Sequence, residues 1–502
     1  MDGIGIIYPR FLAEISMAIQ KYFRKMFILV RVLAALLGFI PLIMLFPLVM
    51  VVLSGEKTMI GYFAVPMFIT AVFSLASIFS LRKKKLHLNT KDGFLLVFLS
   101  WVLASLLGAV PFMFCGFGFT DSFFESACSF ATTGATTITD VESLPRSLLL
   151  WRSISHWFGG IGIILVSVAL LPVLGIGGFQ LLKAEETGPE KEKITPKIMV
   201  TAQLLLLAYS SLTFILFGLY LFGGMNWFDA LCHSLTTMAT GGVSVKNSGL
   251  AAYSSGFFDT VTAVFFLLAG INFSVYYRLL LGKFRDILNS TEIKVYIGIF
   301  ITASLVLTVS LLPEYGSLPT ALRYASFHCA SIISTAGGAV VNYENWPAFS
   351  KMILFILMFS GGCSGSTAGG FKVIRHIVLW KQMRSDMKRL IYPQGVFNIQ
   401  INKRVGRKDV VYGAAGFFFL YFSLVAIVTL VTALSGIDVF SSFSAALSMT
   451  GNIGGGFGVI GPGNNYSVFA DHIKWLYSFV MIAGRLEMWT VFVLFTTVYW
   501  RR

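Results

Sequence analysis

Four short segments rich in threonine and glycine recur along the chain, and their composition suits coordination of a bare monovalent cation. Aligned on one glycine each, at positions 134, 241, 337 and 451, they cover residues 124–137, 231–244, 327–340 and 441–454. A cation that has shed its water needs oxygen ligands. A glycine-containing strand can supply them, because glycine permits the backbone angles that turn carbonyls inward. Four such strands around one axis predict rings of oxygen ligands, with threonine hydroxyls adding to them.

The predicted selectivity filter occupies the windows 132–136, 239–243, 335–339 and 449–453. Its predicted K⁺ ligands are Thr132, Thr133, Gly134, Ala135, Ala239, Thr240, Gly241, Gly242, Thr335, Ala336, Gly337, Gly338, Thr450, Gly451, Asn452 and Ile453. A single Thr-Gly or Gly-Gly pair could merely end a buried helix. Four in register favour a filter. Because the windows differ in sequence, we expect weaker selectivity than in a pore of four identical strands.

The rest of the chain has the composition of an integral membrane protein. Of its 502 residues, 56% are apolar and only 12% are charged, and the mean hydropathy is +0.80. A soluble fold could not bury so much apolar surface, whereas lipid is itself an apolar solvent. The net charge of +15 does not indicate nucleic acid, because the basic residues lie in short loops that would face lipid headgroups.

Apolar runs predict an all-α protein with membrane-spanning helices and shorter helices between them. Ten runs are long enough to span: 26–53, 60–81, 93–115, 148–174, 198–224, 258–281, 293–312, 352–380, 409–434 and 472–499. Four shorter stretches, at 121–133, 227–240, 320–335 and 438–450, suit re-entrant half-helices, with Asp121, Asp229 and Asp438 at three of their starts as N-caps. Their carboxyl ends would face a cation with the negative pole of the helix dipole.

These elements predict four pseudo-repeats of span, half-helix, filter loop and span around one pore. The predicted divisions are 1–92 with two extra spans, 93–182, 183–290, 291–408 with a gating loop and a basic loop, and 409–502. No cleaved signal peptide is expected, because the run 26–53 is too long for one.

The distribution of basic residues predicts the orientation. If the half-helices enter and leave on the outer side, the inner segments carry 27 Lys or Arg and the outer segments carry 4. This bias follows the positive-inside rule. The N-terminus, the loop 372–408 and the C-terminus are therefore expected in the cytoplasm. The loop 372–408 holds ten of these basic residues and is expected to contact headgroups or a soluble regulator.

The run 352–380 is interrupted by a polar, glycine-rich stretch that cannot form a straight helix facing lipid. We expect this stretch to lie beneath the filter and to gate it; a glycine-kinked helix packed on a neighbour is the alternative. The predicted gate residues are Gly361, Gly362, Cys363, Ser364, Gly365, Ser366, Thr367, Ala368, Gly369, Gly370 and Arg485. Arg485 belongs to this set because an intramembrane charge usually faces a pore or a partner, and Glu487 is the alternative partner for it.

The motifs resemble the Trk/Ktr/HKT superfamily of K⁺ transporters, and within it the bacterial TrkH-type subunits. Besides the filter segments, the resemblance rests on residues 151–164, 182–189, 361–370, 388–394 and 484–487. The third segment departs from the family in reading Thr-Ala-Gly-Gly, and the fourth continues with four glycines within 454–458, where a proline is common.

The resemblance implies K⁺ uptake across the cytoplasmic membrane by a homodimer with one pore per chain. It also implies gating by the loop 361–370 and control by cytoplasmic TrkA-type subunits that bind NAD- or ATP-type nucleotides. No cofactor is expected in this chain, and K⁺ is the transported ion.

One other function remains open, and an enzyme is not expected. A proton- or Na⁺-coupled K⁺ symporter would need an intramembrane carboxylate near the path, for which Glu125 and Glu487 are the candidates. An enzyme would need a polar catalytic cluster, yet His156, His233 and His328 belong to different repeats and the five cysteines show no metal-ligand spacing.

Overall fold

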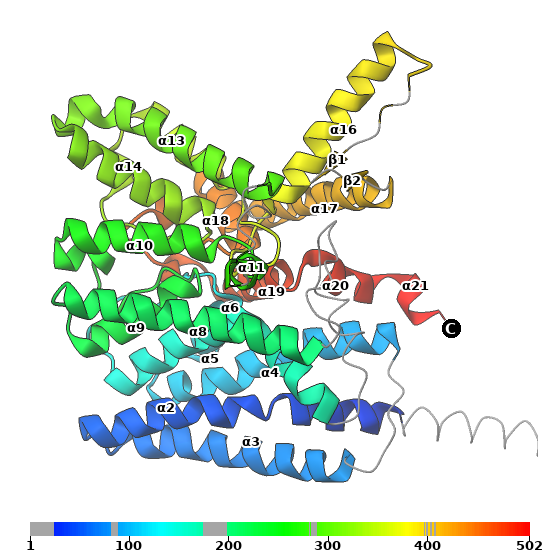
Figure 1. Ribbon diagram of the computed structural model, residues 1–502. Helices are drawn as coiled ribbons and strands as arrows, with labels where there is room; N and C mark the ends of the chain where they lie inside the picture. The colour runs from blue at the N-terminus through cyan, green and yellow to red at the C-terminus, as the bar shows by residue number, and fades with distance from the viewer. Residues whose placement is uncertain are drawn as a thin grey trace, which may run out of the picture.

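The computed structural model describes residues 25–81, 89–173, 198–280, 282, 289–395, 397, 400–401, 404–405 and 408–501. Most helices run roughly side by side in a stack that begins with α3 and α2 and reaches α13 at the opposite edge (Figure 1). The α-helices are α2 (Phe39–Ser54), α3 (Met59–Leu81), α4 (Thr90–Phe114), α5 (Phe119–Ala131), α6 (Arg146–Val173), α8 (Ile198–Phe222), α9 (Trp227–Met238), α10 (Gly256–Ala269), α11 (Ser274–Leu280), α13 (Thr291–Tyr315), α14 (Leu318–Ile333), α15 (Ala348–Leu357), α16 (Val373–Ile391), α17 (Lys408–Ala433), α18 (Val439–Gly451), α19 (Asp471–Arg485), α20 (Met488–Phe492) and α21 (Thr497–Trp500).

Short 3₁₀ helices and one small hairpin complete the described structure. The 3₁₀ helices are η1 (Gly249–Tyr253), η2 (Tyr343–Asn345), η3 (Gly458–Ile460), η4 (Tyr466–Val468) and η5 (Val493–Phe495). The strands β1 (Gln400–Ile401) and β2 (Arg404–Val405) pair antiparallel. The expected all-α membrane fold is confirmed apart from this hairpin.

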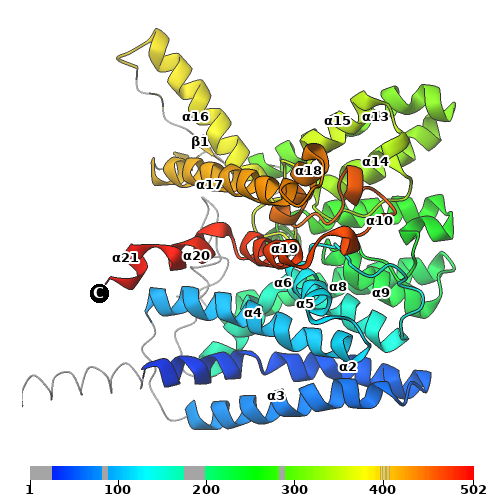
Figure 2. The ribbon, with the colours of Figure 1, turned by 180° about the vertical axis from the view of Figure 1, so that it is seen from behind.

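Four units of one plan follow each other along the chain. Each consists of a long outer helix, a short half-helix, a loop and an inner helix: α4–α5–α6, α8–α9–α10/α11, α13–α14–α15/α16 and α17–α18–α19/α20. Each half-helix packs against the outer and inner helices of its own unit, and α5 also packs against α19, which joins the last unit to the first. The view from behind shows α5, α6 and α19 together at the centre of the stack (Figure 2).

The half-helices have 13, 12, 16 and 13 residues, so none can cross a hydrocarbon core of about 30 Å at 1.5 Å per residue. Of the three predicted N-caps, only Asp438 caps its half-helix, by accepting a hydrogen bond from the Ser441 N–H over 3.0 Å. The predictions for Asp121 and Asp229 are wrong: both lie inside the first turn, where Asp121 pairs with Lys474 and Asp229 accepts from the Tyr253 hydroxyl.

The inner helix of every unit is interrupted, whereas the sequence predicts an interruption only in the run 352–380. In α6 the backbone of Gly162 is left-handed, with φ 83°. The expected span 258–281 is two helices, α10 and α11, and the expected span 472–499 bends by 113° between α19 and the segment Met488–Phe495. Glu487 at this bend has φ 59°, a value that a continuous helix does not allow.

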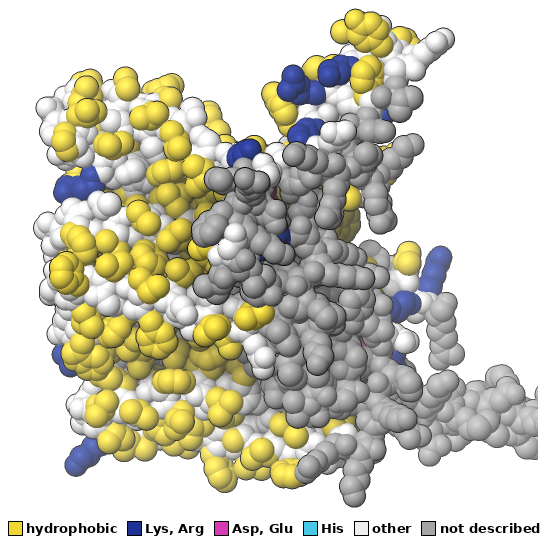
Figure 3. All heavy atoms as spheres, viewed as in Figure 1, with side chains coloured by type: hydrophobic (Ala, Val, Ile, Leu, Met, Phe, Trp, Pro, Cys, Tyr) yellow, Lys and Arg dark blue, Asp and Glu magenta, His cyan; other side chains and the backbone are white. Residues whose placement is uncertain are grey.

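Within the described residues, six helices are long and apolar enough to cross a membrane, and the bent α19–α20 pair makes a seventh. On the face shown in Figure 3, apolar side chains spread over the stacked helices, and Lys and Arg side chains are most frequent on the projecting helix α16 and near the C-terminal end. The amino-terminal stretch 1–24, the segment 174–197 with its motif at 182–189, and part of the loop 372–408 lie outside the described residues.

Candidate ion pathway

All four half-helices end in the same backbone motif, which fixes the true register of the repeats. One or two residues after each helix end, a residue other than glycine is left-handed: Thr132, Thr240, Thr335 and Asn452 have φ between 53° and 58°. The next N–H then bonds to the carbonyl five residues back, as in Thr133 to Cys128 and Ile453 to Ser448. This is the Schellman arrangement. β-Branched residues rarely adopt it, so three threonines here indicate strain held by the surroundings.

This register corrects the sequence alignment in two of the four repeats. The glycine two positions after the left-handed residue is Gly134, Gly242, Gly337 or Gly454, each with positive φ. Glycines 241 and 451, used in the sequence alignment, are not the equivalents of Gly134. Thr450 and Gly451 are the last residues of α18, and Ala239 is the C-cap of α9. The equivalent stretches, called ring segments 1 to 4 below, are 132–135, 240–243, 335–338 and 452–455.

The ring segments close on one another in cyclic order. A Cβ added at Gly134 would overlap the carbonyl oxygen of Gly241 in segment 2. Likewise, a Cβ added at Gly242 would overlap the carbonyl oxygen of Ala336. A Cβ at Gly337 would overlap that of Ile453, and a Cβ at Gly454 would overlap that of Thr133. Each glycine of one segment therefore packs on the second carbonyl of the next, and segment 4 returns to segment 1. Both the positive φ and the lack of space require glycine at these four positions.

Buried polar side chains hold the segments from behind. Glu125 of α5 accepts hydrogen bonds from Thr136 Oγ1 at 2.7 Å and Thr137 N at 2.6 Å, and it pairs with Arg152 of α6 at 3.3 Å. Both charged side chains are at most 4% exposed. His233 occupies the position in α9 that Glu125 has in α5, and its Nε2 lies 3.3 Å from the hydroxyl of Ser244, the equivalent of Thr136.

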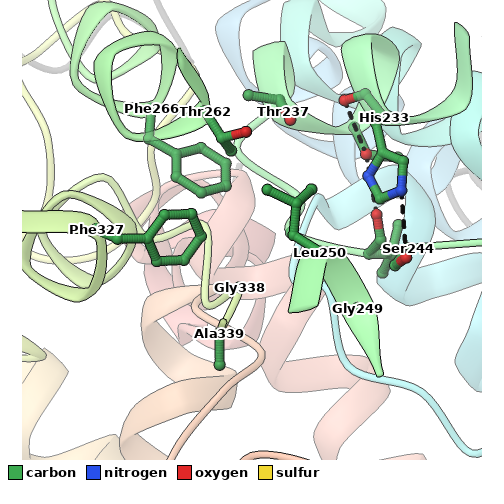
Figure 4. Close-up of a pocket in the computed structure, with 13 residues that line it drawn as sticks. His233, Thr237, Ser244, Gly249, Leu250, Thr262, Phe266, Phe327, Gly338 and Ala339 are labelled. Carbon is green, nitrogen blue, oxygen red and sulfur yellow. Dashed lines mark hydrogen bonds between the residues drawn. The ribbon is translucent and has the colours of Figure 1, made fainter. Parts of the chain in front are cut away.

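A small cavity of about 50 Å³, with both polar and apolar lining, borders segments 2 and 3 (Figure 4). Its lining includes His233, Thr236 and Ser244 on one side and Phe327 with Gly338 on the other. The volume suffices for ordered water, and the hydroxyls offer hydrogen-bond partners.

The glycine-rich loop between α15 and α16 lies against the carboxyl ends of three half-helices. The N–H of Gly369 donates to Thr335 Oγ1 at 2.7 Å, and the Thr367 hydroxyl donates toward Met238 O at 3.2 Å. A Cβ on Gly369 would lie 2.5 Å from Gly451 O. All ten predicted gate residues of this loop belong to the interruption, and its two ends are joined by the Gly361 N–H bond to Phe371 O.

Arg485 joins this loop to the first repeat. Its guanidinium donates to Thr367 O at 2.6 Å and to the α6 carbonyls of Gly159 and Gly160 at 2.5 and 2.7 Å. The carboxylate of Glu487, suggested by the sequence as its partner, forms an ion pair of 2.5 Å with Arg375 of α16. Lys372 donates to Ala368 O. Sequence reasoning missed Lys372, Arg375 and Arg152, although each is a basic residue inside or beside an apolar run.

The described residues hold no group of three or more His, Cys, Asp or Glu that could bind a metal. The five cysteines are free thiols. His156 belongs to α6 and bonds to Arg152 O at 2.9 Å, whereas His328 of α14 bonds to Tyr324 O at 2.8 Å. The three histidines lie in separate helices, each in contact with backbone or a hydroxyl.

Comparison with known proteins agrees with this architecture. The family model described as TrkH, a cation transport protein, matches residues 62–315 and 313–501. The "Trk system potassium uptake protein TrkH" of Salmonella typhimurium is 38% identical over 84% of this chain and 88% of its own length. The corresponding protein of Vibrio parahaemolyticus is 34% identical over 94% of this chain and 99% of its own.

A solved structure shows the same fold. The crystal structure of the potassium transporter TrkH from Vibrio parahaemolyticus superposes with a TM-score of 0.84 at 33% identity, covering 94% of this chain and 99% of that one. The family is one of transport proteins and not of enzymes. From the family match and these relatives together, the chain belongs to the TrkH family of cation transport proteins.

Proposed function

We propose that this chain carries K⁺ into the cell through the ring formed by its four ring segments. The observation that supports this most directly is the cyclic packing of each glycine on the next segment's carbonyl. It brings four stretches of backbone oxygen around one axis at the ends of four half-helices, whose dipoles favour a cation. The relatives' names specify potassium uptake.

The ligands in this proposal are the residues of the ring segments except the last residue of segments 1 to 3. Thr132, Thr133, Gly134, Thr240, Gly241, Gly242, Thr335, Ala336, Gly337, Asn452 and Ile453 remain from the sequence prediction, and Gly454 and Gly455 join them. The carbonyls of Ala135, Val243 and Gly338 accept hydrogen bonds from their half-helices and are not among these ligands. The Thr132 hydroxyl is buried and has no hydrogen-bond partner among the described residues, which suits an oxygen kept for an ion.

The loop 361–370 serves in this proposal as the gate. The loop contacts the ends of three half-helices. Arg485, at the bend of the fourth unit, donates hydrogen bonds both to this loop and to α6. Opening requires these contacts to break. The glycines of the loop supply the conformational freedom for that movement.

Conduction without stoichiometric coupling is favoured over symport. Glu125, a carboxylate candidate for coupling, is engaged by Arg152, Thr136 and Thr137. Glu487 is engaged by Arg375. A carboxylate held by a buried cation and several donors is poorly suited to pick up and release a proton in each cycle.

The assembly completes the proposal. We place the N-terminus, the α16 region and the C-terminus in the cytoplasm, following the basic residues. The chain works in the inner membrane as a homodimer with a cytoplasmic, nucleotide-binding regulatory subunit. In this proposal the regulatory subunit docks on the basic surface of α16 (Figure 3).

The test is ⁸⁶Rb⁺ uptake into proteoliposomes that contain only this protein, driven by an internal K⁺ load. We expect uptake that external K⁺ blocks far more strongly than Na⁺, without any pH or Na⁺ gradient. Uptake that required an imposed proton or Na⁺ gradient would replace the channel with a symporter. No uptake under any gradient would reject transport by this chain alone.

A further inference from the structure

Three of the four ring segments are fastened to their own half-helix by a side-chain hydrogen bond at one equivalent position. The thiol of Cys128 donates to Ala135 O at 2.9 Å, Thr236 Oγ1 donates to Val243 O at 3.0 Å, and Ser331 Oγ donates to Gly338 O at 2.7 Å. Each donor stands four residues before the left-handed residue. Each acceptor is the last residue of its ring segment.

Position and burial make this pattern specific. The three donors are at most 2% exposed, so solvent does not compete for the carbonyls. The donors differ in type, being a thiol, a threonine and a serine, and share only the ability to donate one hydrogen bond. Thr236 Oγ1 also lies 3.1 Å from Cys232 O and 3.3 Å from His233 O, within its own helix, so its single proton is shared among three acceptors.

Segment 4 is fastened differently. Ser448 stands at the equivalent position, but within the described part of the chain its hydroxyl makes no hydrogen bond to Gly455 O. Instead, the hydroxyl of Tyr466 donates to Gly454 O at 2.9 Å, and that of Tyr343, from the third unit, donates to Gly456 O at 2.7 Å. One tyrosine thus bonds to segment 4 itself and another to the residue that follows it.

Each of these hydrogen bonds fixes the orientation of the carbonyl that accepts it. The donor belongs to the half-helix, so the carbonyl that accepts from it points toward that helix. We infer that Cys128, Thr236 and Ser331 are positioning residues that keep the last carbonyl of segments 1 to 3 out of the ion path. They thereby limit the oxygen ligands that an ion meets at that end of the ring.

This inference rests on the proposed function, since it concerns the selectivity of the same ring. A released carbonyl could turn toward the ion and vary its distance, and an adaptable ring discriminates less between K⁺ and Na⁺ than a fixed one. In segments 2 and 3 the effect should be smaller than the loss of the bond alone would give. Segments 2 and 3 border the cavity of Figure 4, where a water can bond to a released carbonyl.

The experiment compares two variants at each position. Cys128→Ala and Ser331→Ala remove the donor, whereas Cys128→Ser and Ser331→Thr keep it. Ser448→Ala is the matched control, because Ser448 makes no bond to its segment's last carbonyl. The readouts are the K⁺ over Na⁺ permeability ratio from ⁸⁶Rb⁺ competition in proteoliposomes, and the difference between the Tm shifts that K⁺ and Na⁺ produce in the purified protein.

We expect the ratio to fall roughly two- to tenfold in the alanine variants, as the loss of one hydrogen bond implies, and to stay near wild type in Cys128→Ser, Ser331→Thr and Ser448→Ala. Unchanged ratios in both alanine variants would overturn the inference, as would equal losses in the donor-keeping variants. If wild type carried no ⁸⁶Rb⁺ the proposed function would fail, while the Tm comparison would still decide whether the donors control ion discrimination.

Discussion

A guanidinium N–H of Arg485 donates a hydrogen bond of 2.6 Å to the carbonyl oxygen of Thr367, in the middle of the glycine-rich loop. Because the same side chain donates to Gly159 O and Gly160 O, one residue of the fourth unit holds the loop of the third against the inner helix of the first. If the loop is the gate, as proposed, these bonds stabilise its closed arrangement.

Replacing Arg485 by Met should therefore favour the open loop. Charge-assisted hydrogen bonds are worth more than neutral ones, so we expect roughly a tenfold increase in ⁸⁶Rb⁺ uptake by proteoliposomes without any regulatory subunit. Arg485→Lys should give a smaller increase, because an ammonium cannot reach carbonyls on both sides as the planar guanidinium does. Uptake that falls in both variants would show that Arg485 promotes conduction.

The register of the fourth segment can be tested with two glycines three residues apart. A Cβ at Gly454 would overlap Thr133 O, and the backbone there has φ 83°. A Cβ at Gly451 would meet only side chains, at 3.2 Å and beyond. Gly454→Ala should reduce ⁸⁶Rb⁺ uptake by roughly tenfold or more, and Gly451→Ala should reduce it much less. The reverse order would restore the alignment on Gly451.

The buried pair of Glu125 and Arg152 should matter for stability. Arg152→Met leaves an uncompensated carboxylate in a buried site, a change that costs about 3–5 kcal/mol in comparable cases. The double variant Glu125→Gln with Arg152→Met should recover part of that loss. Thermal unfolding in detergent measures both, with the exposed Glu142→Gln as control. Additive effects of the two single changes would show that the pair is not coupled.

The carboxylate of Glu56 connects the amino-terminal helix pair to the pore units. It accepts from Arg146 N at 2.9 Å and from Ser147 N at 3.2 Å, both in the first turn of α6. A negative group there satisfies free N–H groups and the helix dipole, so Glu56→Ala should cost about 1–2 kcal/mol. The measurement is Tm in detergent beside Lys57→Ala, an exposed neighbour. Equal Tm values for the two variants would rule out a capping role.

The architecture could be predicted from the sequence because it depends on the composition and charge of whole segments and not on the exact position of single residues. The apolar runs and the excess of Lys and Arg on one side distinguish a half-helix from a span, and helices occupy all four predicted half-helix positions. The interruptions in α6, between α10 and α11, and at Glu487 were not predicted, because an apolar run with one or two glycines reads as continuous.

The register of the ring was harder to predict because glycine alone does not mark it. Segments 2 and 4 each contain several glycines, and the choice between Gly241 and Gly242, or Gly451 and Gly454, depends on φ and on the neighbouring segment's carbonyl. A better signal was present: a threonine or asparagine two residues before glycine, as in Thr240 and Asn452, with a hydroxyl or thiol residue four positions earlier.

Cyclic closure within a single polypeptide has a consequence for how such a protein diversifies. In a pore assembled from four identical subunits, every substitution occurs in all four subunits and changes all four sides of the pore. Here the contact between Gly454 and Thr133, or between Gly242 and Ala336, exists once. A mutation therefore alters one quarter of the circumference, so drift and selection can adjust this ring in small, asymmetric steps that a fourfold-symmetric assembly cannot take.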